Sequence, residues 1–405
     1  MQKLDNKKRI NQLSLLLTLT YMISYVTRTN FGAVVSEVSH ATGISKSLLS
    51  MPLTGSFITY GVGQLISGVL GDRISPKKLI RLGLLITVSM NLLLPLCKEP
   101  WLMTAAWCVN GMAQAFMWPP IVRIMASLLH EDDYKEVASQ VSCGGNIGTI
   151  LVYLISPLFI ATTGWQGTFY FSAALGAIML IIWLVKGVDV EHRIHNPQKK
   201  QNTDTWKIIF SPLIIAVMIM IVMQGMLRDG ITTWMPSFIA ESFHLGNEIS
   251  ILTGVLLPIF SILCIQLTNF LYRRYIRNPL ACAGALFGMG TLFSILLYFF
   301  CRSNVVLSVL FSAAFIGCIH GVNLLLIGML PRYFEKRGNV STMSGILNAC
   351  TYIGSAVSTY GVAALSEGIG WSNTILLWVL VALLGSVGCA VCIHPWKKSF
   401  ASDHE

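Results

Sequence analysis

Twelve predominantly apolar stretches constrain this chain more than any other feature of its sequence. They lie at 11–35, 48–71, 78–97, 101–129, 137–161, 166–187, 208–239, 248–271, 279–300, 304–330, 340–365 and 372–394. A helix of about 20 apolar residues crosses the hydrocarbon core of a bilayer and satisfies its own backbone hydrogen bonds there. Only 11% of the 405 residues are charged, against roughly 25% in soluble domains. The sequence therefore predicts an all-α membrane protein with twelve transmembrane helices, and it excludes a soluble enzyme, a nucleic-acid-binding module and a disordered chain.

The longest polar stretch divides these predicted helices into two groups of six. Residues 188–207 (VDVEHRIHNPQKKQNTDTWK) are rich in charge and contain no apolar run. We therefore expect an N-terminal six-helix bundle over 1–187, a cytoplasmic linker loop over 188–207 and a C-terminal six-helix bundle over 208–405.

The distribution of Lys and Arg predicts the orientation of the chain. With the N-terminus inside, 22 of the 28 basic residues lie in inner segments and three lie in outer loops. Cytoplasmic loops are normally the basic ones. Both termini are therefore predicted to be cytoplasmic, in a multi-pass protein of the cell (inner) membrane. The net charge of +10 then reflects topology and contact with anionic lipid, and no nucleic-acid partner is expected.

Three pairs of positions repeat between the two halves. The pairs are Arg28 and Arg228, Asp72-Arg73 and Tyr272-Arg273, and Gly164-Trp165 and Gly370-Trp371. The first pair is 200 residues apart, late in the first helix of each half, and the last pair opens the final helix of each half. Such parallel six-helix repeats, with a binding site between them, are typical of transporters.

The loop after the second predicted helix contains a candidate gating motif, GVLGDRISPKK at 68–78. Its small glycines allow two helices to approach closely. The Asp72 carboxylate can accept hydrogen bonds from nearby arginines or face a helix N-terminus, which would hold the cytoplasmic side in one state. Arg73 and Arg123 are the other candidate gating residues. The simpler interpretation is a basic inner loop that happens to contain Asp72.

Arg28 and Arg228 are the main candidate binding residues. An arginine near the bilayer centre costs about 3 kcal/mol on insertion scales, so it usually faces a partner or a water-filled cavity. Adjacent helical residues point about 100° apart, so we expect Asp229 to be poorly placed to neutralise Arg228. The two guanidiniums are therefore expected to face a shared cavity, where paired planar forks suit a doubly charged tetrahedral oxyanion. The alternative is that each arginine snorkels or packs on backbone carbonyls.

Other polar side chains occur at helical spacing, where they can line the same cavity. The candidates are Tyr21 and Tyr25 on the face of Arg28, Tyr60 with Gln64, Asn348 with Tyr352, and His320 with Asn323. Tyrosine hydroxyls can hydrogen-bond phosphate or sugar oxygens while their rings form the walls. Each of these residues can equally be a lipid-interface aromatic or an interhelical hydrogen bond.

These motifs resemble those of a known family. The 68–78 loop resembles the inter-helix signature of the major facilitator superfamily. Five further segments resemble the organophosphate:phosphate antiporters, the glycerol-3-phosphate and hexose-phosphate exchangers, over nearly the whole chain: Tyr21-x-x-x-Tyr25-x-x-Arg28-x-Asn30-Phe31, Tyr60-Gly61, Trp118-Pro119-Pro120-x-x-Arg123, Arg228 to Trp234-x-Pro236, and Tyr352-Ile-Gly354. The resemblance implies two six-helix bundles around a central site, with Arg28 and Arg228 as a phosphate clamp and with Tyr21, Tyr25, Tyr60 and Tyr352 lining it.

The sequence departs from that family at three places. Gln64 stands where the family usually has a lysine, and Gly145 stands where its fifth helix often carries a histidine. The carboxylate usual in its eighth helix has no counterpart around Gly254. Fewer ionisable groups leave room for a different substrate or a different coupling mode.

The leading functional prediction is secondary transport of a small organic anion, most plausibly a phosphate ester exchanged for phosphate. We expect a monomer that needs no cofactor or metal. No nucleotide-binding loop is present, so ATP-driven transport is not expected. The spans also contain no metal-ligand cluster or nucleophile–base pair. One alternative is a proton-coupled carrier of a carboxylate such as a sugar acid, with Asp229 as the possible proton site. Another is a transporter-like sensor of a sugar phosphate. A membrane enzyme is the least favoured class.

Overall fold

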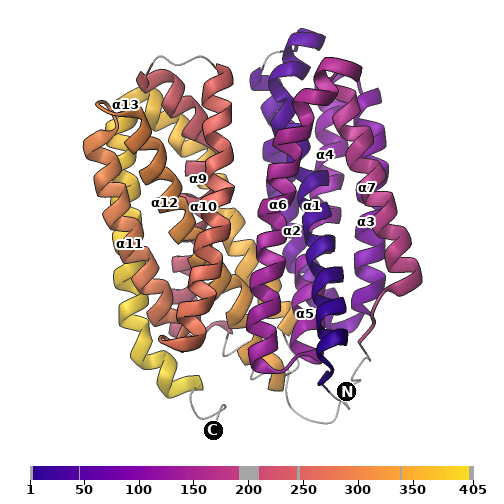
Figure 1. Cartoon of the computed structure of the whole chain (residues 1–405), viewed down its shortest axis with the longest axis vertical. Helices are drawn as coiled ribbons and strands as arrows, with labels where there is room; N and C mark the ends of the chain where they lie inside the picture. Colours follow the sequence, from indigo (N-terminus) through magenta and orange to yellow (C-terminus); the bar gives the residue numbers. More distant parts are fainter. Residues whose placement is uncertain (1–2, 45, 191–208, 244–246, 338–339, 401–405) are drawn as a thin grey trace. The chain divides into compact units, whose positions relative to one another are not determined.

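The computed structural model of the chain describes residues 3–44, 46–190, 209–243, 247–337 and 340–400, and every regular element within these ranges is helical (Figure 1). The first part of the chain forms α1 (Lys7–Thr42), α2 (Lys46–Arg73), α3 (Pro76–Leu93), η1 (Leu94–Leu96), α4 (Pro100–Gln114), α5 (Trp118–Leu128), α6 (Glu131–Thr163) and α7 (Trp165–Lys186). The second part forms α9 (Pro212–Phe243), α10 (Asn247–Arg274), α11 (Pro279–Phe300), α12 (Val305–Asn323), η2 (Leu324–Met329), η3 (Leu330–Arg337) and α13 (Val340–Phe400).

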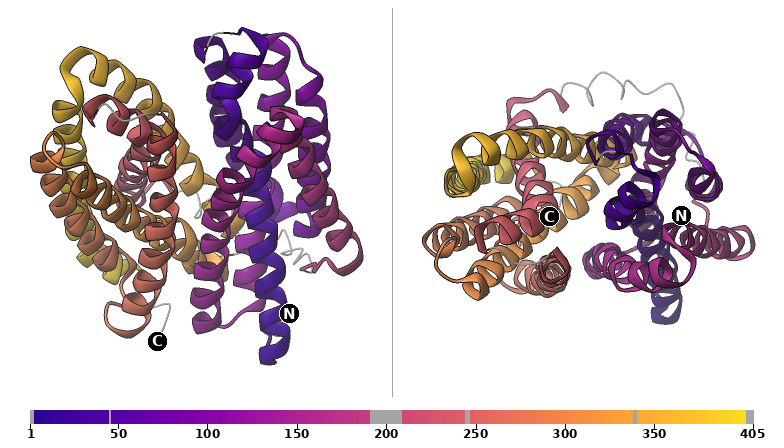
Figure 2. Two further views of the ribbon diagram at one scale, coloured as in Figure 1. Left: turned by 45° about the horizontal axis from the view of Figure 1, so that its top comes forward. Right: turned by 90° about the horizontal axis from the view of Figure 1, so that it is seen from above.

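The chain divides into two compact units (Figure 2). Unit 1 comprises Met1–Lys199 with Phe334–Ala349, and unit 2 comprises Lys200–Tyr333 with Cys350–Glu405. The boundary between Ala349 and Cys350 therefore lies within α13, and a short segment from late in the sequence packs with the first six predicted spans. Of the predicted linker 188–207, only residues 188–190 are among the described residues.

Each of the twelve predicted apolar ranges is mainly helical where the structure describes it. The range 279–300 coincides with α11, and nine of the described helices are long and apolar enough to cross a membrane. The other three predicted spans lie in α1, in α4 with α5, and in the first part of α13. The spans in α1 and in the first part of α13 contain more polar residues, whereas the range 101–129 is divided by a turn at 115–117 into helices of only 15 and 11 residues. Pro119 and Pro120 explain this break, because proline donates no backbone hydrogen bond and disfavours helix in the residue before it.

The repeated Gly-Trp pair has the same backbone conformation in both halves. Gly164 has φ +77° and Gly370 has φ +80°. This left-handed region is costly for residues with a Cβ and routine for glycine. Gly164 ends α6 and Gly370 interrupts α13, so in both places Trp165 and Trp371 begin a new helical run. The predicted opening of the last helix in each half is confirmed.

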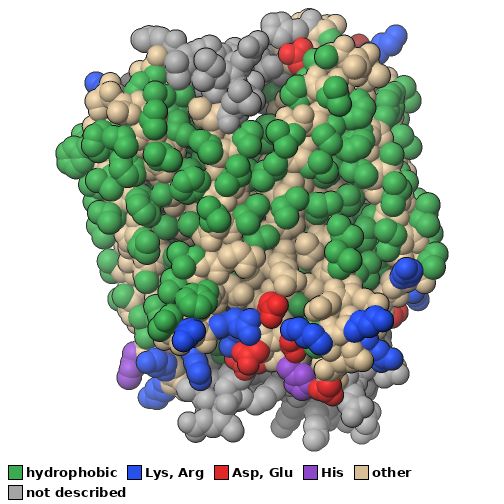
Figure 3. Space-filling view, in the orientation of Figure 1, with side chains coloured by type: hydrophobic (Ala, Val, Ile, Leu, Met, Phe, Trp, Pro, Cys, Tyr) green, Lys and Arg blue, Asp and Glu red, His purple; other side chains and the backbone are tan. Residues whose placement is uncertain are grey.

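The surface of the helices is that of an integral membrane protein. Large apolar side chains such as Leu15, Ile58, Leu158, Leu263 and Val391 are 55–69% exposed. The face drawn in Figure 3 is covered by hydrophobic side chains, with Lys and Arg gathered beyond one edge of the apolar region. Lipid tails cover such a surface, whereas a soluble protein would bury it.

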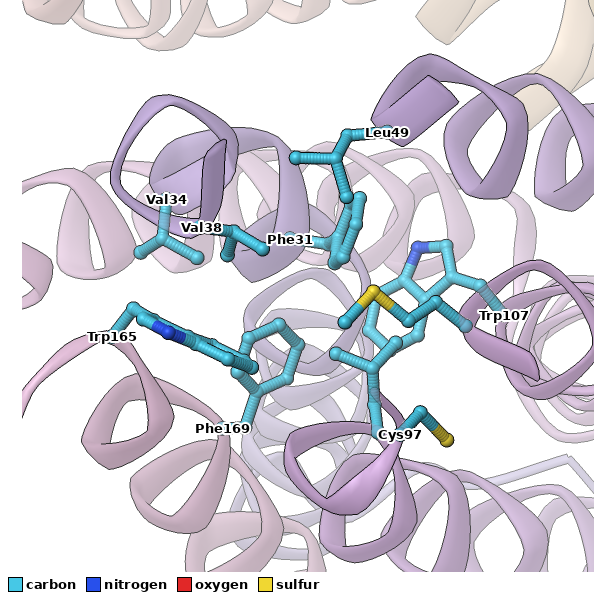
Figure 4. Close-up of a cluster of buried hydrophobic side chains, with 10 residues drawn as sticks. Phe31, Val34, Val38, Leu49, Cys97, Trp107, Trp165 and Phe169 are labelled. Atoms are coloured by element: carbon cyan, nitrogen blue, oxygen red, sulfur yellow. The ribbon is translucent and has the colours of Figure 1, made fainter. Parts of the chain in front are cut away.

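An aromatic cluster holds the helices of unit 1 together near the end of α1 (Figure 4). Trp107 and Phe169 are fully buried, and their ring centroids lie 5.7 Å apart in an edge-to-face arrangement. Phe31 lies 5.6 Å from Trp107, and Trp165 lies 5.7 Å from Phe169. The cluster joins α1, α4 and α7 through large contact areas, so it fixes the helix that carries Arg28.

The predicted orientation can be tested with reporter fusions. A reporter that is active only outside the membrane should be silent when fused at Glu405, and it should be active when inserted in the 36–47 or 241–247 segments. The positive-inside rule is the physical reason, since basic loops resist translocation. Activity at Glu405 would contradict either the twelve-span count or the predicted orientation.

Candidate functional site

Arg28 lies against two tyrosine rings in unit 1. Its guanidinium carbon is 4.3 Å from the centroid of Tyr25, one turn earlier in α1, and 4.8 Å from that of Tyr60 in α2. Tyr60 is only 3% exposed. A guanidinium within about 6 Å of an aromatic centroid is attracted to the ring face. The two rings therefore hold the guanidinium in place.

Tyr21 and Trp118 join Tyr25 and Tyr60 in a group of aromatic side chains, which we call the aromatic wall. The Tyr21 ring lies 5.0 Å from Tyr25 and 4.8 Å from Trp118, which begins α5. The hydroxyls of Tyr21 and Tyr25 are 3.5 Å apart. The sequence prediction that Tyr21, Tyr25 and Arg28 share one face of a helix is therefore reflected in ring and cation contacts. Trp118 belongs to a segment that resembles the antiporters, but it was not among the predicted lining residues.

Gly145 makes room for these rings. A Cβ atom at Gly145 in α6 would lie 2.9 Å from Cε2 of Tyr25 and 3.2 Å from Cε1 of Tyr21. The first distance is below any ordinary carbon–carbon contact, so a larger residue requires the rings to move. The departure from the family histidine at this position thus has a physical counterpart, because tyrosine rings occupy the space that a side chain from α6 would need.

Gln64 contacts the turn between α4 and α5. The side chain is fully buried, and its Nε2 is 3.4 Å from the carbonyl oxygen of Ala115, in the turn between α4 and α5. A carbonyl freed by a helix break needs such a donor. Gln64 therefore supports the turn that carries Trp118, and it offers no exposed surface to a ligand in this conformation.

Arg228 forms a bidentate ion pair with its neighbour Asp229 in unit 2. Nε and Nη2 of Arg228 each donate a 2.8 Å hydrogen bond, to Oδ1 and Oδ2 of Asp229 respectively. The expectation that Asp229 is poorly placed to neutralise Arg228 is wrong. The 100° separation of adjacent side chains holds at Cβ, but the long arginine side chain folds back far enough for its guanidinium to meet the carboxylate. The pair is largely buried, with side-chain exposures of 9% and 18%.

Three more residues lie around this ion pair. Nη1 of Arg228 is 3.4 Å from Oδ1 of Asn323, at the end of α12, and the Tyr352 centroid lies 5.6 Å from the guanidinium. The Ser355 hydroxyl donates a hydrogen bond to Oδ2 of Asp229. Ser355 was not predicted, although its position three residues after Tyr352, on nearly the same face of α13, could have indicated it. Asn323 was expected near the cavity, on the same helix face as His320.

His320 is half-buried between two hydrogen-bonding groups, and Asn348 is buried. Nδ1 of His320 is 3.0 Å from the carbonyl oxygen of Ile316 and 3.1 Å from the hydroxyl of Ser261. Asn348 is 5% exposed and lies one turn before Tyr352 in α13. The roles of both residues in ligand binding stay predictions.

Arg123 contacts the end of the α2 gating motif. Its Nη1 donates to the carbonyl oxygen of Gly71 and, over 3.1 Å, to that of Ile74. These are two of the carbonyls that a helix end leaves without partners. Arg73 is exposed, and the side chain of Asp72 lies outside the described part of the structure although its backbone is helical. Arg123 thus connects α5 to the motif, and the gating role of Asp72 stays a prediction.

α2 also packs closely on the first part of α13, within unit 1. A Cβ atom at Gly68 would lie 2.9 Å from the carbonyl oxygen of Ser341 and 3.1 Å from Cα of Gly345. A Cβ at Gly345 would lie 2.8 Å from Cα of Gly68. The two backbones therefore touch at glycines, the usual means of close helix approach in membranes.

The two arginine clusters have the chemistry of anion-binding groups. Each offers a planar guanidinium beside tyrosine, on helices that fix its position, and guanidiniums bind carboxylate or phosphate through paired hydrogen bonds. Among the residues that the structure describes, no group of three or more His, Cys, Asp or Glu side chains is arranged to hold a metal ion.

Comparisons with known proteins agree with this architecture. A family model described as "Major Facilitator Superfamily" matches residues 17–341. A "Probable hexose phosphate transport protein" of Chlamydia pneumoniae is 22% identical, over 94% of this chain and 89% of its own length. The "Glycerol-3-phosphate transporter" of Bacillus subtilis is 23% identical, over 93% and 90%. Among solved structures, the proton:xylose symporter XylE superposes with a TM-score of 0.78 at 12% identity, covering 98% of this chain and 96% of that one.

Proposed function

Because this chain belongs to the major facilitator superfamily, we propose that it is a secondary transporter of an organophosphate, such as a sugar phosphate or glycerol phosphate. We further propose that it exchanges this ester for inorganic phosphate by alternating access. Relatives that match nearly the full chain are named as hexose phosphate and glycerol-3-phosphate transporters, which supports the substrate class.

The placement of Arg28 is the observation that carries this proposal. A guanidinium inside an apolar helix bundle is costly unless it has a task or a partner. Here two tyrosine rings lie close to it, with centroids 4.3 and 4.8 Å from its guanidinium carbon, and such cation–π contacts hold the group in place for an oxyanion. Tyr21 and Tyr25 bring hydroxyls to the same wall, and hydroxyls can donate to phosphoryl or sugar oxygens.

Arg228 supplies the second cationic group. It occupies the equivalent position in the second half of the sequence, 200 residues later, and it lies beside Tyr352 as Arg28 lies beside Tyr25. We propose that both arginines bind the same phosphoryl group. This part of the proposal rests on the sequence repeat, because each cluster is described within its own unit.

Transport assays in vesicles test the function directly. Vesicles containing purified protein and loaded with inorganic phosphate should take up labelled glucose 6-phosphate or glycerol 3-phosphate, and uptake should fall to the protein-free level when the internal phosphate is omitted. Ester uptake that does not depend on internal phosphate would exclude exchange but keep the substrate class. Ester binding without any flux would indicate a sensor and contradict transport.

A proton-coupled carrier of a carboxylate is the second candidate. The buried carboxylate of Asp229 favours it, because an acid within a membrane span is a functional suspect by default. In the same vesicles, this candidate predicts uptake of a sugar acid such as glucuronate that increases with an inward proton gradient, without competition from phosphate esters.

A further inference from the structure

The Arg228–Asp229 pair uses the same donors that an incoming anion needs. Asp229 accepts from Nε and Nη2 at 2.8 Å, and Nη1 faces Asn323 at 3.4 Å. All three nitrogens of the guanidinium are therefore engaged by side chains of unit 2. A carboxylate and a phosphoryl group bind arginine through the same paired N–H···O geometry, so Asp229 occupies one fork of Arg228 as a bound anion would.

The pair is also electrically balanced before any ligand binds. One guanidinium and one carboxylate, with side-chain exposures of 9% and 18%, contribute no net charge. An oxyanion that reaches Arg228 places negative charge next to the Asp229 carboxylate in poorly hydrated surroundings. Like charges that share a buried site disfavour ionisation of the weaker acid, and a proton on Asp229 removes the repulsion.

We propose that Asp229 is an internal anion that competes with the transported anion for Arg228, and that Asp229 takes up a proton when the transported anion binds. This inference rests on the proposed role of Arg228 as an anion ligand, and it adds the coupling that follows from the carboxylate beside it. The Ser355 hydroxyl, which donates to Oδ2 of Asp229, holds the carboxylate in the competing position.

Other titratable groups of the described residues lie near this carboxylate or its partner. Arg228 is its partner on α9, and Tyr352 of α13 lies 5.6 Å from the guanidinium. His320 of α12 interacts electrostatically with both Arg228 and Asp229, so it is the competing candidate for the proton. Ser261 of α10 and Ser355 of α13 contribute hydroxyls only.

The number of protons that the protein takes up when a phosphate ester binds tests the proposal. Glucose 6-phosphate is titrated calorimetrically into the purified full chain at pH 8, in two buffers that differ in ionisation enthalpy. The second pKa of a phosphate ester is about 6, so the ligand is a dianion at pH 8, and protons taken from the buffer enter the complex. We expect an uptake that approaches one proton and an affinity that falls about tenfold for each pH unit above 7, as linkage requires.

Two variants identify the acceptor of that proton. Asp229→Asn removes the competing charge but keeps the size, so at pH 8 it should bind the ester at least about tenfold more tightly and take up no proton. His320→Gln should keep the proton uptake of the wild type. Asp132→Asn is the matched control, because it removes a carboxylate that is 78% exposed in the first turn of α6, and it should behave as the wild type.

Several outcomes overturn the proposal. Proton uptake that persists in Asp229→Asn assigns the proton to the ligand or to another group, and loss of uptake in His320→Gln assigns it to His320. Weaker ester binding by Asp229→Asn would mean that Asp229 positions Arg228 rather than competes for it. The number of protons taken up on ester binding is measured on the wild-type protein and does not depend on any variant. If the wild type binds the ester without taking up a proton, this inference is overturned but the proposed function is not. Absence of any ester binding overturns the proposed function and this inference together.

Discussion

Replacing Arg28 and Arg228 together by alanine is expected to abolish binding of phosphate esters. Each single alanine variant should already lower the affinity by at least about 100-fold, because removing one partner of a buried ionic contact costs about 3–5 kcal/mol. The double variant should lose less than the sum of the two, since residues that share one ligand are not additive. Lysine at either position should also bind weakly, because it keeps the charge but lacks the planar fork.

A matched control exists for this experiment. Arg274 also lies over aromatic rings, at 6.0 Å from Phe270 and 5.9 Å from Tyr275, but it is exposed in the last turn of α10. Arg274→Ala should bind the ester as the wild type does, as measured by calorimetry or by thermal stabilisation with ligand. Strong binding retained by the Arg28→Ala, Arg228→Ala double variant would contradict both the clamp and the phosphate substrate.

The same clamp gives a pH signature at acid pH. Two guanidiniums favour a dianion, and a phosphate ester loses its second charge below about pH 6. Binding should therefore weaken as the pH falls through that region, although the arginines do not titrate. A carboxylate substrate would show no such loss between about pH 7 and 5.5, because its pKa is near 4. In Asp229→Asn, only this acid limb of the pH profile should remain.

Replacing Gly345 by valine is expected to reduce transport at least about fivefold. A Cβ there would lie 2.8 Å from Cα of Gly68 and would also press on the carbonyl oxygen of Gln64. Backbone atoms cannot swing aside as a side chain can, so α13 must move away from α2. Overpacking of this kind costs about 1–3 kcal/mol, which shifts a two-state equilibrium about 5- to 150-fold away from the packed conformation.

Gly361→Val is the matched control for this substitution. Gly361 lies in the same helix, α13, and a Cβ at that position meets no described atom within 4 Å. Both variants make the same change in helix propensity, so only the contact with α2 differs between them. Ester uptake and the labelling rate of a cysteine placed at the buried Ser341 should change in Gly345→Val alone. Equal behaviour of the two variants would show that the glycine contact is dispensable.

The helices could be predicted from the sequence because membrane spans follow from run length. The bilayer sets the number of apolar residues that a span needs, and this is why α11 was bounded correctly at Pro279–Phe300. Gly370 was likewise expected to separate two helices, and its φ of +80° explains the choice of glycine. The turn at 115–117 was missed, because an apolar run looks alike whether one helix or two occupy it.

The candidate site was predicted less completely, because its contacts depend on side-chain paths. Helical spacing placed Tyr25 beside Arg28, since residues three apart share a face. The same geometry failed for Arg228 and Asp229, because it describes Cβ directions and takes no account of the reach of an arginine. Ser355 was missed, because a single serine in an apolar helix is usually bonded to its own backbone.

The α2 surface that contains Gly68 and Gly71 obtains its packing partner late in synthesis of the chain. Gly68 and Gly71 pack on residues of the segment 334–349, which a ribosome makes roughly 260 residues later, or about 10–50 s at ordinary elongation rates. During that interval this surface of α2 lies in the membrane without the segment on which it packs. A fragment that ends before this segment should therefore be a better target for membrane quality control than the finished chain, even if its own helices have all inserted.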